Sequence, residues 1–272
     1  MILSFHPIIP GDKNIICAGR DPGEAELTAI KAARAVILPQ GCRESLYRMA
    51  KENTRHIFPD YDTRFRYPGK IGQAEMFRAF SATFPSTLAF PSVRAWKDRG
   101  GQPVFGFPLV VKSDWGGEGS GVRLIRDQTG LDDAINKVLA AENGGDFGFL
   151  LQEYVPCSSR SLRVVVIHRA LVSYWRVGRP GEPLMGGLSQ GADIDFHKDP
   201  LLVAIAEGLV RDFCGKTGIN LAGFDLIFPE NGGGPLFLEV NWFFGRRGLG
   251  GSTGYYKILE KNVRAWIRET LG

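Results

Sequence analysis

Two apolar runs on either side of a turn-forming segment constrain the fold of this chain more than any other feature. The runs, AGFDLIF at 222–228 and PLFLEVN at 235–241, are rich in strand-forming residues, and PENGGG between them is typical of a turn. They predict a β-hairpin. Asp225 and Glu239 each lie seven residues from Gly232, so a hairpin centred there places the two carboxylates opposite each other.

This acid pair predicts a cation site. Side chains alternate along a strand, so Asn241 shares the face of Glu239. Like charges directly opposite each other destabilise a sheet pair unless a cation lies between them. A hard divalent ion such as Mg²⁺, held by carboxylate and amide oxygens and by nucleotide phosphates, fits Asp225, Glu239 and Asn241. Each acid taken alone is better interpreted as a solvated strand end or an arginine partner, and it is their combination on one face that predicts the site.

The rest of the chain predicts an α+β protein with an α/β N-terminal lobe. The first 70 or so residues alternate short apolar runs with helical patterns, as a small βαβ lobe with a parallel sheet does. Beyond residue 100, strand-like runs joined by Gly-rich turns favour antiparallel pairing. The expected strands are 107–112, 121–126, 147–155, 161–168, 170–177 and the hairpin, and the expected later helices are 131–143, 199–218 and 255–271. On 199–218, Leu201, Leu202, Ile205, Leu209, Val210 and Phe213 form one apolar stripe.

Composition narrows the class of protein. With 272 residues, 44% hydrophobic and 23% charged, the chain can bury a substantial core, and it contains no apolar run of transmembrane length. The four cysteines have no metal-binding or redox spacing. The net charge of +4 suits anionic ligands, but Lys and Arg are dispersed, which argues against nucleic acid. The N-terminal segment lacks signal-peptide features, so we expect a cytoplasmic protein without a membrane partner.

A lysine and a glycine cluster predict a phosphate-binding loop. Lys112 ends one expected strand, and Gly116, Gly117 and Gly119 precede the next. Glycines let backbone N–H groups approach phosphate oxygens, and the lysine adds a positive charge. Both the P-loop and the dinucleotide fingerprint run from strand into helix, whereas a strand follows here. A flexible hairpin turn is the other interpretation of the cluster.

The segment QEYV, Gln152 to Val155, follows an apolar strand and could join two lobes. Its backbone groups could meet an adenine edge, and Glu153 could accept from a ring substituent or a ribose hydroxyl. A strand end that turns polar at the surface is the alternative. Downstream, Arg246 and Arg247 could clamp a substrate carboxylate or be solvated loop residues.

The order Lys70, Lys112, glycine loop, QEYV, Arg163, GFDL and LEVN resembles the ATP-grasp superfamily, closest to the RimK-like and glutathione-synthetase-like carboxylate–amine ligases. The resemblance spans roughly residues 65 to 255. It implies two α+β lobes that clasp ATP after a small pre-ATP-grasp domain. The expected ranges are 1–68 for that domain, 69–155 for the small lobe with the glycine loop, and 156–272 for the C-terminal lobe with the metal site.

The resemblance also implies roles for individual residues. Lys70 and Lys112 would contact ATP phosphates beneath the glycine loop, and Gln152, Glu153, Tyr154 and Val155 would hold the adenosine. Two Mg²⁺ ions, which Mn²⁺ could replace, would bind Asp225, Glu239 and Asn241, with Glu239 bridging. Arg163 and Arg176 would face the transferred phosphoryl group, and Arg246 and Arg247 would bind substrate.

The implied reaction joins a small-molecule or peptide carboxylate to an amine through an acyl phosphate, and it is ATP-dependent; a homo-oligomer is left open. The chain departs from the family on the acceptor side. Ser161 stands where relatives often carry an acid, the Arg-x-Asn signature is absent, and Trp242, Phe243 and Phe244 follow the last Asn. Two alternatives follow: a nucleotide-binding regulatory protein without ligase activity, and a small-molecule kinase.

Overall fold

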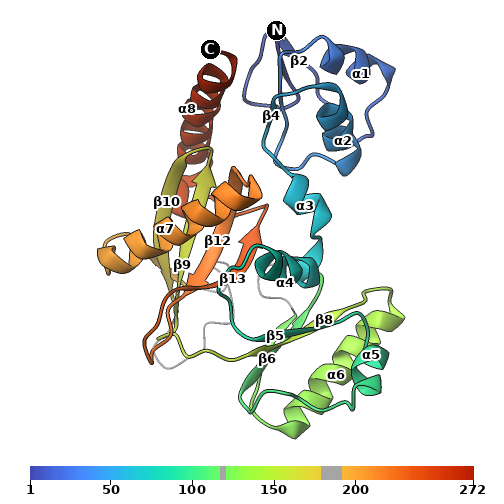
Figure 1. The fold of residues 1–272 in the computed structure, drawn as a ribbon, viewed down its shortest axis with the longest axis vertical. Helices are drawn as coiled ribbons and strands as arrows, with labels where there is room; N and C mark the ends of the chain where they lie inside the picture. The colour runs from blue at the N-terminus through green and yellow to red at the C-terminus, as the bar shows by residue number, and fades with distance from the viewer. Residues whose placement is uncertain (117–120, 179–191) are drawn as a thin grey trace.

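The computed structural model describes residues 1–116, 121–178 and 192–272, and within them the chain forms three sheets (Figure 1). The first sheet is parallel, in the order β2-β1-β3-β4, as expected for a βαβ lobe. Its strands are short, and β4 is only two residues long, so its sequence carries little strand pattern. The elements of this part are β1 (Ile2–Ser4), β2 (Lys13–Asn14), α1 (Glu24–Lys31), β3 (Ala35–Ile37), α2 (Glu44–Asn53), β4 (Ile57–Phe58) and α3 (Asp62–Arg66).

The second sheet is antiparallel, in the order β5-β8-β6-β7, and packs against α5 and α6. Helix α6 begins where Asp127 accepts a hydrogen bond from the Gly130 N–H, and its apolar residues Leu131, Ile135 and Val138 face the sheet. The elements are β5 (Thr87–Phe90), α5 (Val93–Asp98), β6 (Leu109–Ser113), β7 (Val122–Ile125), α6 (Gln128–Asn143) and β8 (Phe149–Glu153).

The third sheet is also antiparallel, in the order β11-β10-β9-β12-β13, and lies between two helices. Alternation along β9 sends Val164 and Val166 into the core under α7, and Val165 and Ile167 into the core under α8. The elements are β9 (Arg160–Ile167), β10 (Ala170–Val177), β11 (Asp193–Asp195), α7 (Pro200–Thr217), β12 (Leu221–Ile227), β13 (Leu236–Asn241), the 3₁₀ turn η2 (Arg247–Leu249) and α8 (Gly251–Leu271).

Helix α8 joins the first and third sheets through a shared core, in which its residues Leu259 and Trp266 pack with Ile37 and Phe58. Helix α4 (Gly69–Ala79) lies between the second and third sheets (Figure 1). Its residues Met76 and Phe77 belong to the core beneath β9, β12 and β13. The division at residues 68 and 155 stays a prediction, because α4 contacts both sheets.

The apolar stripe expected on α7 is wrong at its N-terminal end. Val210 and Phe213 are buried, but Leu201 is 79% exposed and Ile205 is 55% exposed. Leu202 and Val203 pack against the core and Ala206 is fully buried, so these turns do have a partner and Leu201 and Ile205 lie on the solvent side of the helix. Because α7 is apolar around much of its circumference, periodicity alone did not show which apolar residues face the core. In the described parts of the chain, no helix is long and apolar enough to span a lipid bilayer.

Candidate functional site

Three charged residues form a row across the third sheet. Asp225 of β12 pairs with Glu239 of β13 on one side and with Arg163 of β9 on the other. The predicted pairing of the two acids is therefore confirmed. Gly223 of β12 leaves space for the Arg163 side chain, because a Cβ at this position would lie only 3.2 Å from Arg163 Nη1.

A bulge in β13 separates the site from the turn. The register centred on Gly232 holds from Gly223 to Asp225, and then shifts by one residue so that Leu226 pairs with Phe237. Without this shift, Phe237 would share the face of Glu239; with it, Phe237 enters the core and Glu239 keeps its place in the row. The simple hairpin expected from the sequence missed this bulge.

Two arginines balance the charge of Asp225. Arg163 donates to both carboxylate oxygens, through Nε and through Nη2 at 2.9 Å, and Arg176 Nη2 lies 2.9 Å from Oδ2. Asn241 Nδ2 also donates to Oδ2, at 3.2 Å. Burial alone would raise the pKa of Asp225, but these guanidinium charges and hydrogen bonds hold it below its usual value. Arginine already supplies positive charge at Asp225, and a metal ion bound to the acid pair stays a prediction.

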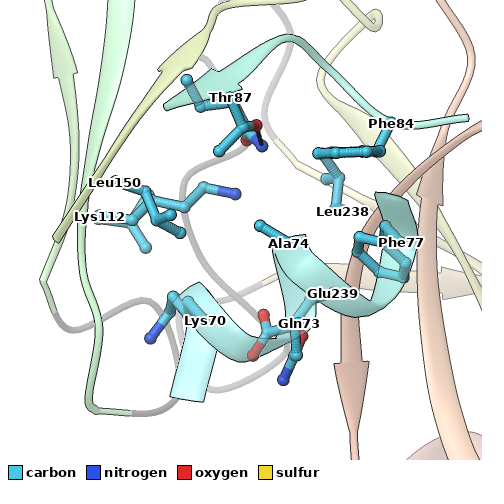
Figure 2. Close-up of a pocket in the computed structure, with 12 residues that line it drawn as sticks. Lys70, Gln73, Ala74, Phe77, Phe84, Thr87, Lys112, Leu150, Leu238 and Glu239 are labelled. Carbon is cyan, nitrogen blue, oxygen red and sulfur yellow. Dashed lines mark hydrogen bonds between the residues drawn. The ribbon is translucent and has the colours of Figure 1, made fainter. Parts of the chain in front are cut away.

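Glu239 lies in a different environment, in the wall of a cleft that Lys70, Lys112 and Gln152 also line (Figure 2). Burial and the charge of Asp225 raise its pKa, against the opposing charges of Lys70, Lys112 and Arg163. In the described residues, no three His, Cys, Asp or Glu side chains are grouped closely enough to hold a metal ion by themselves. Other oxygen ligands, such as phosphates, would have to complete a metal site.

Two lysines bring positive charge to the cleft. Lys112, on β6, points its ammonium group into the cleft, whereas Lys70, near the start of α4, donates to the carbonyl oxygen of Gly116 at 3.0 Å. Burial lowers the pKa of Lys112 to about 8; the charge of Lys70 acts in the same direction, and Glu239 and Asp225 oppose it. The predicted Gly117 and Gly119 lie outside the described residues.

The start of α4 docks closely on the end of β6. Asp114 Oδ1 accepts from the N–H of Ile71 at 2.7 Å, and the carbonyl of Asp114 accepts from the N–H of Lys70 at 3.2 Å. Gly69 has φ +68°, and a Cβ there would lie 2.6 Å from Asp114 Oδ1. These contacts fix Lys70 beside Gly116. Asp114 was not singled out from the sequence, since its role depends on a helix 43 residues earlier in the chain.

Of the QEYV segment, Gln152 faces the cleft. Its Nε2 donates to Thr87 Oγ1 at 2.8 Å, and both side chains are buried in the cleft wall. The Glu153 side chain is exposed, and its backbone N–H donates to the carbonyl of Ser86 at 2.9 Å. Tyr154 and Val155 are half-buried. Gln152 therefore joins Lys70, Lys112 and Glu239 around one cleft.

Arg176 and its support explain the serine at 161. Ser161 is fully buried and its Oγ accepts from Arg176 Nε at 3.1 Å and from Nη2 at 2.9 Å. A neutral acceptor leaves the charge of Arg176 available to Asp225, the acid that it approaches.

The segment after Asn241 packs against the first part of the chain. The Arg246 guanidinium lies 4.7 Å from the ring centres of both Tyr255 and Tyr256, while Arg247 is exposed. Phe243 is 60% exposed and lies 4.9 Å from the Arg64 guanidinium. The two predicted substrate arginines thus differ, because Arg246 is held by aromatic rings and Arg247 faces solvent.

Comparisons with known proteins show which family this chain resembles. A family model for the RimK-like ATP-grasp domain matches residues 98–258. A probable alpha-L-glutamate ligase of Azotobacter vinelandii is 29% identical over 180 aligned positions, covering 62% of this chain and 56% of that ligase. A probable alpha-L-glutamate ligase of Pseudomonas paraeruginosa is 25% identical over 309 aligned positions, covering 100% of this chain and 98% of the relative.

A solved structure shares the fold. N5-carboxyaminoimidazole synthetase from Staphylococcus aureus, complexed with ADP, superposes with a TM-score of 0.64 at 11% identity, over 96% of this chain and 69% of that one. The expected α+β ATP-grasp fold is confirmed. The family model matches more than half of this chain, and the chain therefore belongs to the RimK-like ATP-grasp family.

Proposed function

We propose that this protein is an ATP- and Mg²⁺-dependent carboxylate–amine ligase that forms an amide or peptide bond through an acyl phosphate. The observation that supports this most directly is the cleft itself. Lys70 and Lys112 stand on one side and Glu239 on the other, between two sheets (Figure 2). The two cations suit a polyphosphate, and the half-buried carboxylate suits a metal ion bound to it.

The chemistry of the donor atoms fits Mg²⁺. Glu239 offers a carboxylate in the cleft, and Asn241 uses its Nδ2 toward Asp225, which leaves its amide oxygen as an acceptor. Asp225 Oδ1 accepts from Arg163 Nε, and a carboxylate oxygen has two lone pairs, so Asp225 could bind a cation while keeping its arginine. When bound, Mg²⁺ would neutralise phosphate charge and align the reacting groups. Glu239, Asp225 and Asn241 would hold the two ions that the resemblance implies.

The residues of this chain would act mainly by position and charge, because phosphoryl transfer requires little covalent chemistry from the protein. Lys112, in a desolvated wall, would gain favourable interaction with phosphate that a solvated lysine would not. Gln152 would contact the base from its fixed place beside Thr87. Arg176 would stabilise charge on the phosphoryl group during attack by the substrate carboxylate.

The substrates we propose are a small-molecule or peptide carboxylate and an amine. Arg247, exposed in η2, could bind a carboxylate, and Phe243 could form part of the acceptor wall. The two bacterial relatives are named as probable alpha-L-glutamate ligases, which supports an acidic amino acid as one substrate. The ADP complex of the S. aureus synthetase supports ATP as the nucleotide.

Replacement of Glu239 by Gln tests the proposal. The purified variant should fold, as judged by circular dichroism, and should lose ADP release in a panel of amino acids and dicarboxylates supplied with ATP and Mg²⁺. Glu75, exposed on the opposite face of α4, offers a matched control, because Glu75→Gln makes the same chemical change outside the cleft. Full turnover by Glu239→Gln would refute the assignment.

The same assay separates the two alternatives. A ligase releases ADP only with an acceptor and yields an amide in mass analysis. A regulatory protein would bind ATP without release of ADP under any acceptor, and a kinase would yield a stable phosphorylated product.

A further inference from the structure

The side chain of Gln73 makes a two-point contact with the backbone of Val240. Gln73 Nε2 donates to the carbonyl oxygen of Val240 at 2.9 Å, and the Val240 N–H donates to Gln73 Oε1 at 2.9 Å. The two residues are 167 positions apart in the sequence. Only a carboxamide side chain can donate and accept in this way, so the contact depends on Gln at this position.

This contact lies at the edge of the third sheet, along β13. Strand β13 is the last strand of its sheet, so alternate backbone groups point away from β12. The carboxamide of Gln73 takes the place that a further strand would have at Val240. Val240 itself is buried in the core, and its neighbours Glu239 and Asn241 point to the opposite face of the sheet. Gln73 therefore binds the backbone of Val240, the residue between the two candidate metal ligands Glu239 and Asn241.

The same helix face is also fixed to the other side of the cleft. Lys70 lies three positions before Gln73, close to one helical turn, and its Nζ donates to the Gly116 carbonyl at 3.0 Å. The start of α4 is held by Asp114, through its carboxylate contact with the N–H of Ile71. Helix α4 thus contacts Gly116 through Lys70 and β13 through Gln73, and both of these side chains line the cleft (Figure 2).

We propose that Gln73 is a positioning residue, which sets Glu239 and Asn241 at a fixed distance from Lys70 so that metal and triphosphate bind together. This inference rests on the proposed function and goes further, because it assigns a role to a residue that touches no reacting atom. Residues that orient metal ligands from behind commonly change metal affinity by roughly 10- to 100-fold when replaced. The base-binding end of the cleft, at Gln152 and Thr87, does not depend on this contact.

Two variants test the role. Gln73→Leu removes both hydrogen bonds at similar volume, and Gln73→Glu keeps the acceptor for the Val240 N–H but places a carboxylate oxygen against the Val240 carbonyl. Gln102 is exposed between α5 and β6, so Gln102→Glu makes the same charge change as Gln73→Glu away from the contact and serves as the control. Hydrogen exchange of the Val240 amide, measured without ligands, should be faster in Gln73→Leu than in the wild type and unchanged in Gln102→Glu. Unchanged exchange in Gln73→Leu would show that the contact does not hold the strand.

Metal binding then separates positioning from simple support of the fold. Mn²⁺ is titrated into each protein at a saturating concentration of a non-hydrolysable ATP analogue. We expect both Gln73 variants to bind Mn²⁺ roughly 10- to 100-fold more weakly, and to keep their affinity for the metal-free nucleotide within about threefold, a difference of less than 1 kcal/mol. Equal loss of both affinities, unchanged metal affinity, or failure of both variants to fold would overturn the positioning role. Absence of Mn²⁺ and nucleotide binding in the wild type would instead refute the proposed function, and the inference with it.

Discussion

Acidification should destabilise the protein through His6. This side chain is 9% exposed, and its Nδ1 accepts from the N–H groups of Ile8 at 3.1 Å and Ile9 at 3.0 Å. Protonation would turn that acceptor into a donor facing two other donors. Burial, reinforced by the charge of Arg246, lowers the pKa of His6 from 6.5 to about 4. The neutral imidazole is therefore the form that the folded state requires.

The sign and size of the effect follow from the two pKa values. Because the pKa is lower in the folded state, the unfolded state binds more protons, so stability is fully present above about pH 6.5 and is lost as the pH falls toward about 4. Each unit of difference between the unfolded and folded pKa of His6 is worth about 1.4 kcal/mol, so the full loss of stability is roughly 3 kcal/mol. Between about pH 7 and about pH 5 the expected loss is about 2 kcal/mol.

Urea unfolding at these two pH values measures this loss, and His6→Asn isolates it from the titration of carboxylates. Asparagine keeps an acceptor near the position of Nδ1 and does not titrate, so the drop between the two pH values should be smaller by about 2 kcal/mol in the variant. His197 is exposed, and His197→Asn should retain the wild-type drop. If wild type and His6→Asn lose equal stability on acidification, the reasoning from burial and hydrogen bonding is refuted.

Three substitutions test the packing around the cleft, each measured by chemical unfolding. Gly69→Ala places a methyl group 2.6 Å from Asp114 Oδ1 at φ +68°, and should cost about 1–3 kcal/mol; an unchanged midpoint would contradict the close docking of α4. Arg163→Leu leaves the buried Asp225 with one guanidinium fewer and should cost about 3–5 kcal/mol, so a neutral or stabilising result would show that the pair is dispensable. Phe77→Ala opens a cavity among aromatic rings and should cost about 3–5 kcal/mol; a loss below about 1 kcal/mol would mean that the core collapses around it.

Much of the sheet could be predicted because its signals are local. The turn between 228 and 235 and the alternation of the flanking strands were enough to place Asp225 opposite Glu239. The α7 stripe failed at Leu201 and Ile205 because this helix also carries Leu202, Val203 and Ala206, which are the residues that face the core in the same turns. The bulge in β13 was missed because it depends on the space available for Phe237 in the core.

The sequence by itself determined the strand pairing of the two acids, the cleft lysines and the family to which the chain belongs. Only the tertiary structure decided the partners of these groups. It brings Arg163 and Arg176 from two other strands to Asp225, and it sets the carboxamide of Gln73 against the edge of β13. Spacing along a chain fixes which face a side chain occupies, but contacts between distant segments depend on how whole elements pack.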